Sequence, residues 1–218
     1  AEGIDGLVLD VKYGAGAFMK SPSEAENLAR RLLEVGRQGG KKVIALLTDM
    51  SQPLGHAVGN SLEVEECLDV LNNKGPNDLR TLSIELASHM IVLGKKSKTL
   101  DSARKLALQI LESGQALEVF KSIVSRQGGD LNGLPKAHHE TKILAEKKGF
   151  IKFLHAEKIG LASLSLGAGR AKAEDKIDYS AGVIIHKKVG ERVDKGEPLF
   201  TIKYNAKEKL ADCIGLLS

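Results

Sequence analysis

The sequence predicts an α/β protein that ends in a smaller, β-rich α+β domain. Two short apolar runs of the buried-strand type, residues 7–11 and 43–47, flank one amphipathic helix, which is typical of a parallel strand–helix–strand unit. Helical segments continue to residue 127, and after Gly128-Gly129 the pattern changes to short strands separated by turns. We therefore expect a parallel-type sheet with flanking helices, followed by the β-rich domain.

Composition excludes several classes of protein. Of the 218 residues, 42% are hydrophobic and 28% are charged, as in a globular chain with a sizeable core. No apolar run reaches the roughly eighteen residues of a membrane helix, and the first residues lack a signal-peptide pattern, so we expect a cytoplasmic protein with no membrane partner. Aromatic side chains make up only 4% and tryptophan is absent, so we expect no nucleic-acid partner. Cys67 and Cys213 lack metal-ligand spacing and are predicted to be free, buried thiols.

The helix of the strand–helix–strand unit has clear start and stop signals. Ser21 is its expected cap, Pro22 lies in its first turn, and Glu24 stands three residues after the cap. Gly39-Gly40 ends it. Its apolar face is formed by four residues with helical spacing, namely Ala25, Leu28, Leu32 and Val35.

A helical block follows the second strand. Asn60 is the expected cap of a helix from about residue 61 to 72, with Glu63 at its third position. Gly75-Pro76 then breaks the chain. Three further helices are predicted, over residues 79–93, 100–112 and 116–127.

The change of pattern divides the chain. We predict a first domain over residues 1–130, a linker over 131–144 and a second domain over 145–218. Strands of the second domain are expected over residues 150–155, 183–186 and 199–204, with a turn-rich hairpin region before the last of them.

Two loops leave the carboxyl ends of the two parallel strands, where open α/β sheets bind ligands. The first, residues 12–18, contains Gly14-x-Gly16, which either lets a ligand approach the backbone or serves only as a glycine turn. The second covers residues 48–55. Together the two loops either form the rim of a ligand pocket or have no binding role. The candidate residues for lining such a pocket are Asp10, Lys12, Phe18, Asp49, Met50 and His56.

Acidic residues gather around the second loop and the helix after it. Asp49, Glu63, Glu65 and Glu66 either complement the helix dipole or include one carboxylate that holds a hard cation together with loop carbonyls. The six histidines are scattered, without metal-ligand spacing, and no nucleophile elbow is present.

Five motifs in order resemble one enzyme family. They are L-D-V-K-Y-G-A-G-A-F-M-K at residues 9–20, L-T-D-M-S-Q-P-L-G at 47–55, K-G-P-N-D-L at 74–79, L-G-A-G-R at 166–170 and K-K-V-G-E-R-V-D-K-G-E-P-L at 187–199. This series is similar to the thymidine and pyrimidine-nucleoside phosphorylases, and the resemblance runs from about residue 3 to the end.

The resemblance implies a pentosyl transfer in pyrimidine nucleoside salvage. A pyrimidine nucleoside and phosphate, the co-substrate, would give the free base and (deoxy)ribose 1-phosphate. The family's phosphate loop and its S-I-x-S-K-K base-binding segment do not occur here. We therefore expect no catalytic residue in this chain, which resembles the C-terminal half of such an enzyme and should be inactive alone. The whole enzyme is expected to be a homodimer formed through the N-terminal domain.

The resemblance also implies a potassium site. Leu54 and Ala57 match positions that bind potassium through carbonyl oxygens, and Glu66 matches its carboxylate ligand. Phe18 matches a residue that packs against the base. His56 falls where the family varies and receives no role.

Two other functions remain open. The V-G-x-x-V-x-x-G-x-x-L pattern at residues 189–199 resembles half of a biotinyl/lipoyl-like barrel-sandwich, which would suit a non-catalytic interaction or carrier module. A modifiable lysine in the expected place is missing. A related phosphoribosyltransferase is the second alternative, against which the 49–55 loop and the extra C-terminal domain argue.

Overall fold

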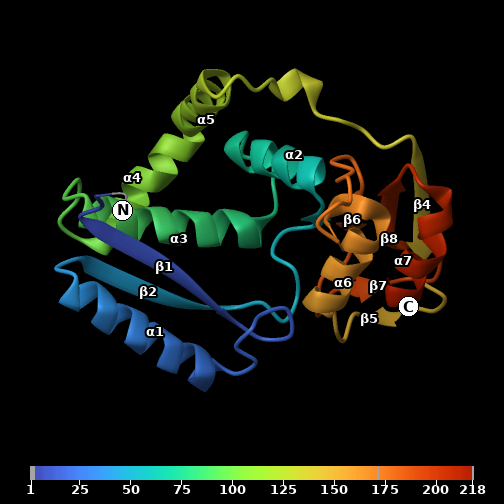
Figure 1. Cartoon of the computed structure of the whole chain (residues 1–218), viewed down its shortest axis with the longest axis horizontal. Coiled ribbons are helices and arrows are strands. Elements are labelled where there is room, and N and C mark those ends of the chain that lie inside the picture. Colours follow the sequence, from blue (N-terminus) through green and yellow to red (C-terminus); the bar gives the residue numbers. More distant parts are fainter. Residues whose placement is uncertain (1–2, 171, 218) are drawn as a thin grey trace.

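A small parallel sheet lies between helices in the first part of the chain. The structure is a computed structural model that describes residues 3–170 and 172–217. Strands β1 (Gly6–Tyr13) and β2 (Lys42–Asp49) pair in parallel, with Gly6 opposite Lys42 and Tyr13 opposite Asp49. Helix α1 (Pro22–Gln38) packs on the sheet from one side and α3 (Asn77–Leu93) from the other (Figure 1). The predicted strand–helix–strand unit is confirmed.

Helix α1 begins and ends where the sequence predicts. The Ser21 side chain accepts a hydrogen bond from the Glu24 N–H, and the Glu24 carboxylate accepts one from the Ser21 N–H, which forms a complete capping box. Gly39 follows the last turn. Ala25 and Ala29 are buried against Val11 of β1, so small side chains let the helix lie close to the sheet.

The helical block contains α2 (Asn60–Leu71), α3, α4 (Leu100–Glu112) and α5 (Gln115–Arg126). The predicted cap of α2 is wrong, because Gly59 and not Asn60 precedes the first turn. The Asn60 amide instead donates to the Ala168 carbonyl oxygen, 2.6 Å away, and Glu63 accepts the Gly59 N–H at 3.0 Å. Asn60 therefore connects distant segments of the chain.

The C-terminal part is built on an antiparallel sheet with the order β3-β6-β8-β4. Its strands are β3 (Ala57–Val58), β6 (Gly182–Ile185), β8 (Pro198–Tyr204) and β4 (His139–Leu144). A second sheet pairs β5 (Gly149–Phe150) with β7 (Arg192–Val193), and in the described part of the chain neither sheet closes into a barrel. Helices α6 (Ala156–Ser163) and α7 (Leu210–Leu217) complete it, with a π-helical turn at Leu164–Ala168 and 3-10 turns at Leu131–Gly133 and Lys207–Lys209.

This part has its own hydrophobic core, which contains most of the fully buried large side chains. Strands, α6 and α7 all contribute to it. Its buried members are Leu154, Ile159, Ala162, Leu166, Ala181, Val183, Ile185, Phe200, Ile202, Tyr204 and Cys213.

Two segments differ from the prediction. Residues 139–144, assigned to the linker, form β4, which pairs with β8. The strand expected over residues 150–155 ends at Phe150, because its partner β7 is only two residues long and begins after a turn at Gly190, where φ is +90°. Residues 151–155 lead into α6 instead.

Strand β3 joins the two parts. It precedes α2 in the sequence, yet it pairs with β6 of the C-terminal sheet, with Ala57 opposite Ile184 and Val58 opposite Val183. The loop before it is therefore held between the helical block and the C-terminal sheet.

The remaining sequence expectations concern membrane spans and cysteines. Within the described residues, no helix is long and apolar enough to cross a membrane. Cys213 is buried and Cys67 is half-buried, and neither forms a disulfide. The expectation of free thiols is confirmed, whereas the expectation of burial is correct only for Cys213 of the two. Burial raises the pKa of the Cys213 thiol to about 11, which lowers its reactivity.

Candidate functional site

A cleft of about 590 Å³ opens at the carboxyl ends of β1 and β2. The structure brings together in its lining four of the six residues predicted to form the rim of a pocket, namely Asp10, Lys12, Phe18 and Met50. Asp49 is engaged elsewhere, because its carboxylate accepts the Ser51 N–H at 2.8 Å. The sixth group, the imidazole of His56, does not line this cleft.

One of the two lysines that line the cleft, Lys12, is paired with a carboxylate. Lys12 donates to Asp10 at 2.7 Å and to the Thr48 hydroxyl at 3.4 Å, and that hydroxyl also donates to Asp10. The Lys12 side chain is about one third exposed. Because Asp10 balances its charge, Lys12 can offer an anion a hydrogen-bond donor but little net charge.

Phe18 stands at the rim of the same cleft. Its side chain is 98% exposed, the highest value among the large apolar residues described. The structure thus places it beside Lys20 and Met19 in the cleft lining, without a buried contact of its own.

The two glycines of the first loop bring the loops into contact. A Cβ at Gly14, where φ is +107°, would lie 2.5 Å from the Ser51 hydroxyl, and one at Gly16 would lie 2.7 Å from the Ala156 Cβ. The Gly16 N–H donates to the Met50 carbonyl at 2.9 Å. These contacts account for Gly14 and Gly16 by backbone geometry, which was one of the two interpretations of the motif.

The three residues implied as potassium ligands meet at a second place. Leu54, Ala57 and Glu66 line one cavity of about 560 Å³ beside α2 and α3. The Glu66 carboxylate accepts the His56 N–H at 2.7 Å and the Ala57 N–H at 3.1 Å. A Cβ at Gly55 would lie 2.1 Å from Glu66 Oε2, so only glycine leaves room for this carboxylate. We call Leu54–Ala57 with Glu66 the cation corner.

Most carbonyls of the loop leading to β3 are already engaged. The Ser51 carbonyl accepts the Ala156 N–H, and the His56 carbonyl accepts the Ile185 N–H. The carbonyls of Pro53 and Gly55 both accept the Lys188 ammonium. No hydrogen bond to the Leu54 carbonyl occurs among the described residues. The His56 carbonyl thus faces β6, whereas the N–H groups of His56 and Ala57 both meet the Glu66 carboxylate.

The oxygen donors of the cation corner fit a hard cation. Burial raises the pKa of the Glu66 carboxyl, while the N–H bonds from His56 and Ala57 lower it in part. This half-buried carboxylate has no lysine or arginine partner in the described chain. Among the described residues, no cluster of three His, Cys, Asp or Glu could hold a metal. Two carbonyls and one carboxylate are oxygen donors of the kind that suit a hard cation.

Sequence reasoning missed the residues that hold this loop. Lys188 reaches it from the far C-terminal part, and Asp78 approaches from the start of α3. Lys188 is one of two adjacent lysines in a charged stretch, so no local pattern separates it from a surface residue. Only the pairing of β3 with β6 explains its proximity.

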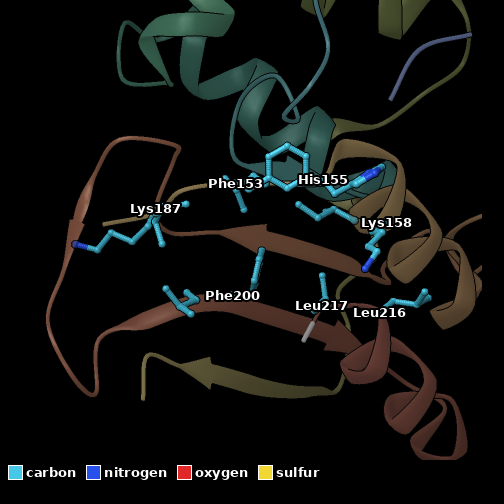
Figure 2. A pocket seen from close by; sticks show the side chains of 11 residues that line it. Phe153, His155, Lys158, Lys187, Phe200, Leu216 and Leu217 are labelled. Carbon is cyan, nitrogen blue, oxygen red and sulfur yellow. The ribbon is translucent and has the colours of Figure 1, made fainter. Parts of the chain in front are cut away.

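A third cavity, of about 300 Å³, contains none of the predicted site residues. Figure 2 shows Lys158 of α6, Phe200 of β8 and Leu216 and Leu217 of α7 around it. Its lining is mostly apolar, with basic groups at Lys158 and Lys187.

Comparisons with known proteins match both parts of the chain. Residues 1–117 match the family described as "Glycosyl transferase family, a/b domain", and residues 150–218 match "Pyrimidine nucleoside phosphorylase C-terminal domain". The chain is 46% identical over 211 residues to a pyrimidine-nucleoside phosphorylase of Bacillus subtilis strain 168, covering 94% of this chain and 49% of that protein. It is 46% identical over 220 residues to a protein of that name from Staphylococcus haemolyticus, covering 98% and 51%, and 44% identical over 214 residues to one from Staphylococcus aureus strain COL, covering 95% and 49%. The chain thus spans about half the length of the curated relatives it matches.

Proposed function

We propose, since the chain belongs to the glycosyl transferase family, that it forms half of a pyrimidine-nucleoside phosphorylase. The reaction is the transfer of a pentosyl group from a pyrimidine to phosphate. The observation that carries this proposal is the ordered match of both parts of the chain to proteins of that name, at 44–46% identity.

The proposed chemistry is a displacement at the sugar. A phosphate oxygen bonds to the anomeric carbon while the glycosidic C–N bond breaks. The electron pair of the broken bond leaves with the base nitrogen, and the base takes up a proton. Holding phosphate and nucleoside in line contributes much of the catalysis in such a reaction. This chain supplies the cleft, with Phe18 and Met50 as packing walls for the base and Lys12 as a nearby cation.

The cation corner is proposed to hold potassium through the carbonyl oxygens of Leu54 and Ala57 and the carboxylate of Glu66. Potassium would supply positive charge next to the bound phosphate. The oxygen donor set and the room left by Gly55 support this assignment.

The other half of the enzyme is proposed to cover the open surfaces of the first part. The parallel sheet has only two strands, fewer than an independent parallel sheet normally needs. Leu28 and Leu32 of α1 are each 37% exposed and Val35 is 67% exposed, although their spacing is that of a buried face. The whole enzyme is proposed to be a homodimer formed through that other half, and to be cytoplasmic. The C-terminal sheets are proposed to be related to the biotinyl/lipoyl-like barrel-sandwich.

A chimera tests this function. The 211-residue segment matched in the Bacillus subtilis phosphorylase is replaced by the corresponding part of this chain, and uracil release from uridine is followed with and without phosphate. We expect phosphate-dependent release of uracil and formation of ribose 1-phosphate. Replacing that segment by an unrelated domain is the control.

Two outcomes separate the alternatives. Uracil consumption that requires a pentose diphosphate and not phosphate would indicate a phosphoribosyltransferase. A folded chimera with neither activity would reject the proposed reaction and favour an interaction module.

A further inference from the structure

Lys188 is a largely buried cation in contact with the loop of the cation corner. Its side chain is only 13% exposed. Its ammonium donates to the Gly55 carbonyl at 2.6 Å and to the Pro53 carbonyl, and it lies 3.1 Å from Asp78 Oδ2. An ammonium has three donors, and these three acceptors match that number.

Asp78 closes the arrangement from the other side. The same carboxylate oxygen accepts the Gly55 N–H at 3.2 Å. Burial alone would raise the pKa of Asp78, but the Lys188 hydrogen bond and charge, with N–H bonds from Leu79 and Gly55, hold it below its ordinary value. The carboxylate form of Asp78 is therefore favoured beside the Lys188 ammonium, 3.1 Å away.

These contacts fix the direction of the Leu54 carbonyl. That carbonyl and the Gly55 N–H belong to one planar trans peptide unit, so they point in opposite directions. Because the N–H is held by Asp78, the Leu54 oxygen points away from Asp78. The carbonyls on either side, of Pro53 and Gly55, are both held by Lys188, so the peptide unit between them is fixed at both ends.

The neighbouring residue of the same turn holds the loop as well. The Val189 N–H donates to the Gln52 side chain at 3.1 Å. Lys187, by contrast, pairs with Glu197 at 3.1 Å, and among the described residues it forms no hydrogen bond or ion pair with the loop. Two adjacent lysines of equal charge therefore have different surroundings, which provides a matched control.

We propose that Lys188 is the positioning residue of the cation corner. Acting with Asp78, its ammonium orients the peptide units from Pro53 to His56 so that the Leu54 carbonyl is presented beside Glu66. This inference rests on the proposed potassium site for its functional meaning. The orientation itself is a property of this chain and is measurable without any activity.

Hydrogen–deuterium exchange on the 218-residue chain tests the assignment. In Lys188→Met, which keeps the length of the stem and removes the charge, the amides of Gly55, His56 and Ala57 should exchange roughly tenfold faster or more. The Pro53 and Gly55 carbonyls lose the ammonium that holds them, so the loop opens more often and carries these amides away from Asp78 and Glu66. Lys187→Met should leave them unchanged. In Lys188→Ala, added propylammonium should restore protection by occupying the place of the lost ammonium.

The amides of α4 serve as an internal reference for global unfolding. If Lys188→Met does not fold, Lys188→Arg keeps the charge but moves the donors, and faster exchange confined to Gly55–Ala57 is then expected. Exchange at these amides equal to wild type in every folded Lys188 variant would overturn the inference.

Potassium enters as a separate arm. Exchange of the chimera, which also contains the other half of the enzyme, is measured in potassium chloride and in choline chloride, and potassium should slow the Gly55–Ala57 amides less in its Lys188→Met variant than in the unsubstituted chimera. If potassium has no effect on the unsubstituted chimera, the proposed cation site is wrong, while the role of Lys188 is still decided by the exchange of its own variants.

Discussion

Glu66 reaches back from α2 to the loop that precedes the helix, and its carboxylate accepts two consecutive backbone N–H groups. The adjacent Glu65 lines the neighbouring cavity and makes no side-chain hydrogen bond within the described part of the chain. Two neighbouring glutamates thus differ in their contacts, and Glu66 is the one that binds the backbone of the cation corner.

This difference allows a matched test of the cation site in the chimera. Glu66→Gln keeps the shape and removes the charge, so the potassium concentration for half-maximal activation should rise about tenfold, equivalent to ~1.4 kcal/mol. The Michaelis constant for phosphate should rise with it. Glu65→Gln removes a charge of the same sign at the adjacent residue and should change neither the potassium concentration nor the Michaelis constant. Equal responses of the two variants would disprove the assignment.

A second residue makes the stability of the chain depend on pH. Asp178 accepts hydrogen bonds from the Ser180 hydroxyl at 2.7 Å and from the Asn205 amide at 2.8 Å. Burial works to raise the pKa of Asp178, but these hydrogen bonds and N–H bonds from Ser180 and Ala181 hold it below its ordinary value. Since a lowered carboxyl pKa stabilises the folded state, that stability is complete above the ordinary pKa and is lost as pH falls through the lowered one.

Asp178→Asn should therefore lower the free energy of unfolding by about 1 kcal/mol at pH 7. The difference from wild type should shrink as pH falls toward about 3, because wild type then loses the same charge. Urea denaturation of the chain between pH 3 and pH 7 measures this. Glu174→Gln in the same loop is the control, and a difference that stays constant with pH would contradict the assignment.

At the scale of elements, the short strand β3 determines where the cation corner lies. Gly182, the first residue of β6, faces it closely, and a Cβ there would lie 2.5 Å from the Val58 carbonyl oxygen and 2.8 Å from Leu62. Gly149 also begins a strand, β5, but a Cβ there would have no neighbour within 4 Å.

Gly182→Ala should separate β3 from β6 and lower the free energy of unfolding by about 1–3 kcal/mol, the usual cost of overpacking. Gly149→Ala should change it by no more than about 0.5 kcal/mol. Chemical denaturation of both variants gives the comparison. A Gly182→Ala chain as stable as wild type, with unchanged amide exchange at Val58, would show that β3 does not depend on this contact.

The sequence predicts the elements that have complete local signals. The capping residues Ser21 and Glu24 place α1, and Thr99 caps α4 at the predicted start. Strand β4 was missed although its burial alternates strictly, because its polar residues resemble those of a linker. Helix α6 was missed because Gly160 interrupts a short helical pattern whose buried residues, Ile159 and Ala162, face the C-terminal core.

The candidate site was predictable only in part, for a physical reason. The proposed ligands Leu54, Ala57 and Glu66 lie within thirteen consecutive residues, so one short segment contains them. The residues that fix them do not, since Lys188 lies 133 positions from Gly55 and is brought there by strand pairing. Contacts made by tertiary structure leave no periodic signal in a single sequence.

At the scale of the whole molecule, the two parts of the chain are unequally complete. The C-terminal sheet encloses a core with several fully buried side chains, whereas the buried cluster among the described residues of the first part consists of Val11, Ala25 and Ala29. Met90 on α3 is 55% exposed and Leu47 on β2 is 43% exposed. These surfaces belong to the part that carries the cleft, which agrees with a chain spanning about half the length of its relatives.

The central claim is that this chain supplies one half of a phosphorylase and needs the other half for catalysis. The direct measurement is uracil release from uridine and phosphate by the purified 218-residue chain, alone and titrated with the segment of the Bacillus subtilis relative that lies outside the match. We expect no release above background from the chain alone, because the phosphate is not held in line, and saturable release as the second segment is added. Release at ordinary enzyme rates by the chain alone would contradict the claim, as would a stable complex of the two segments that releases none.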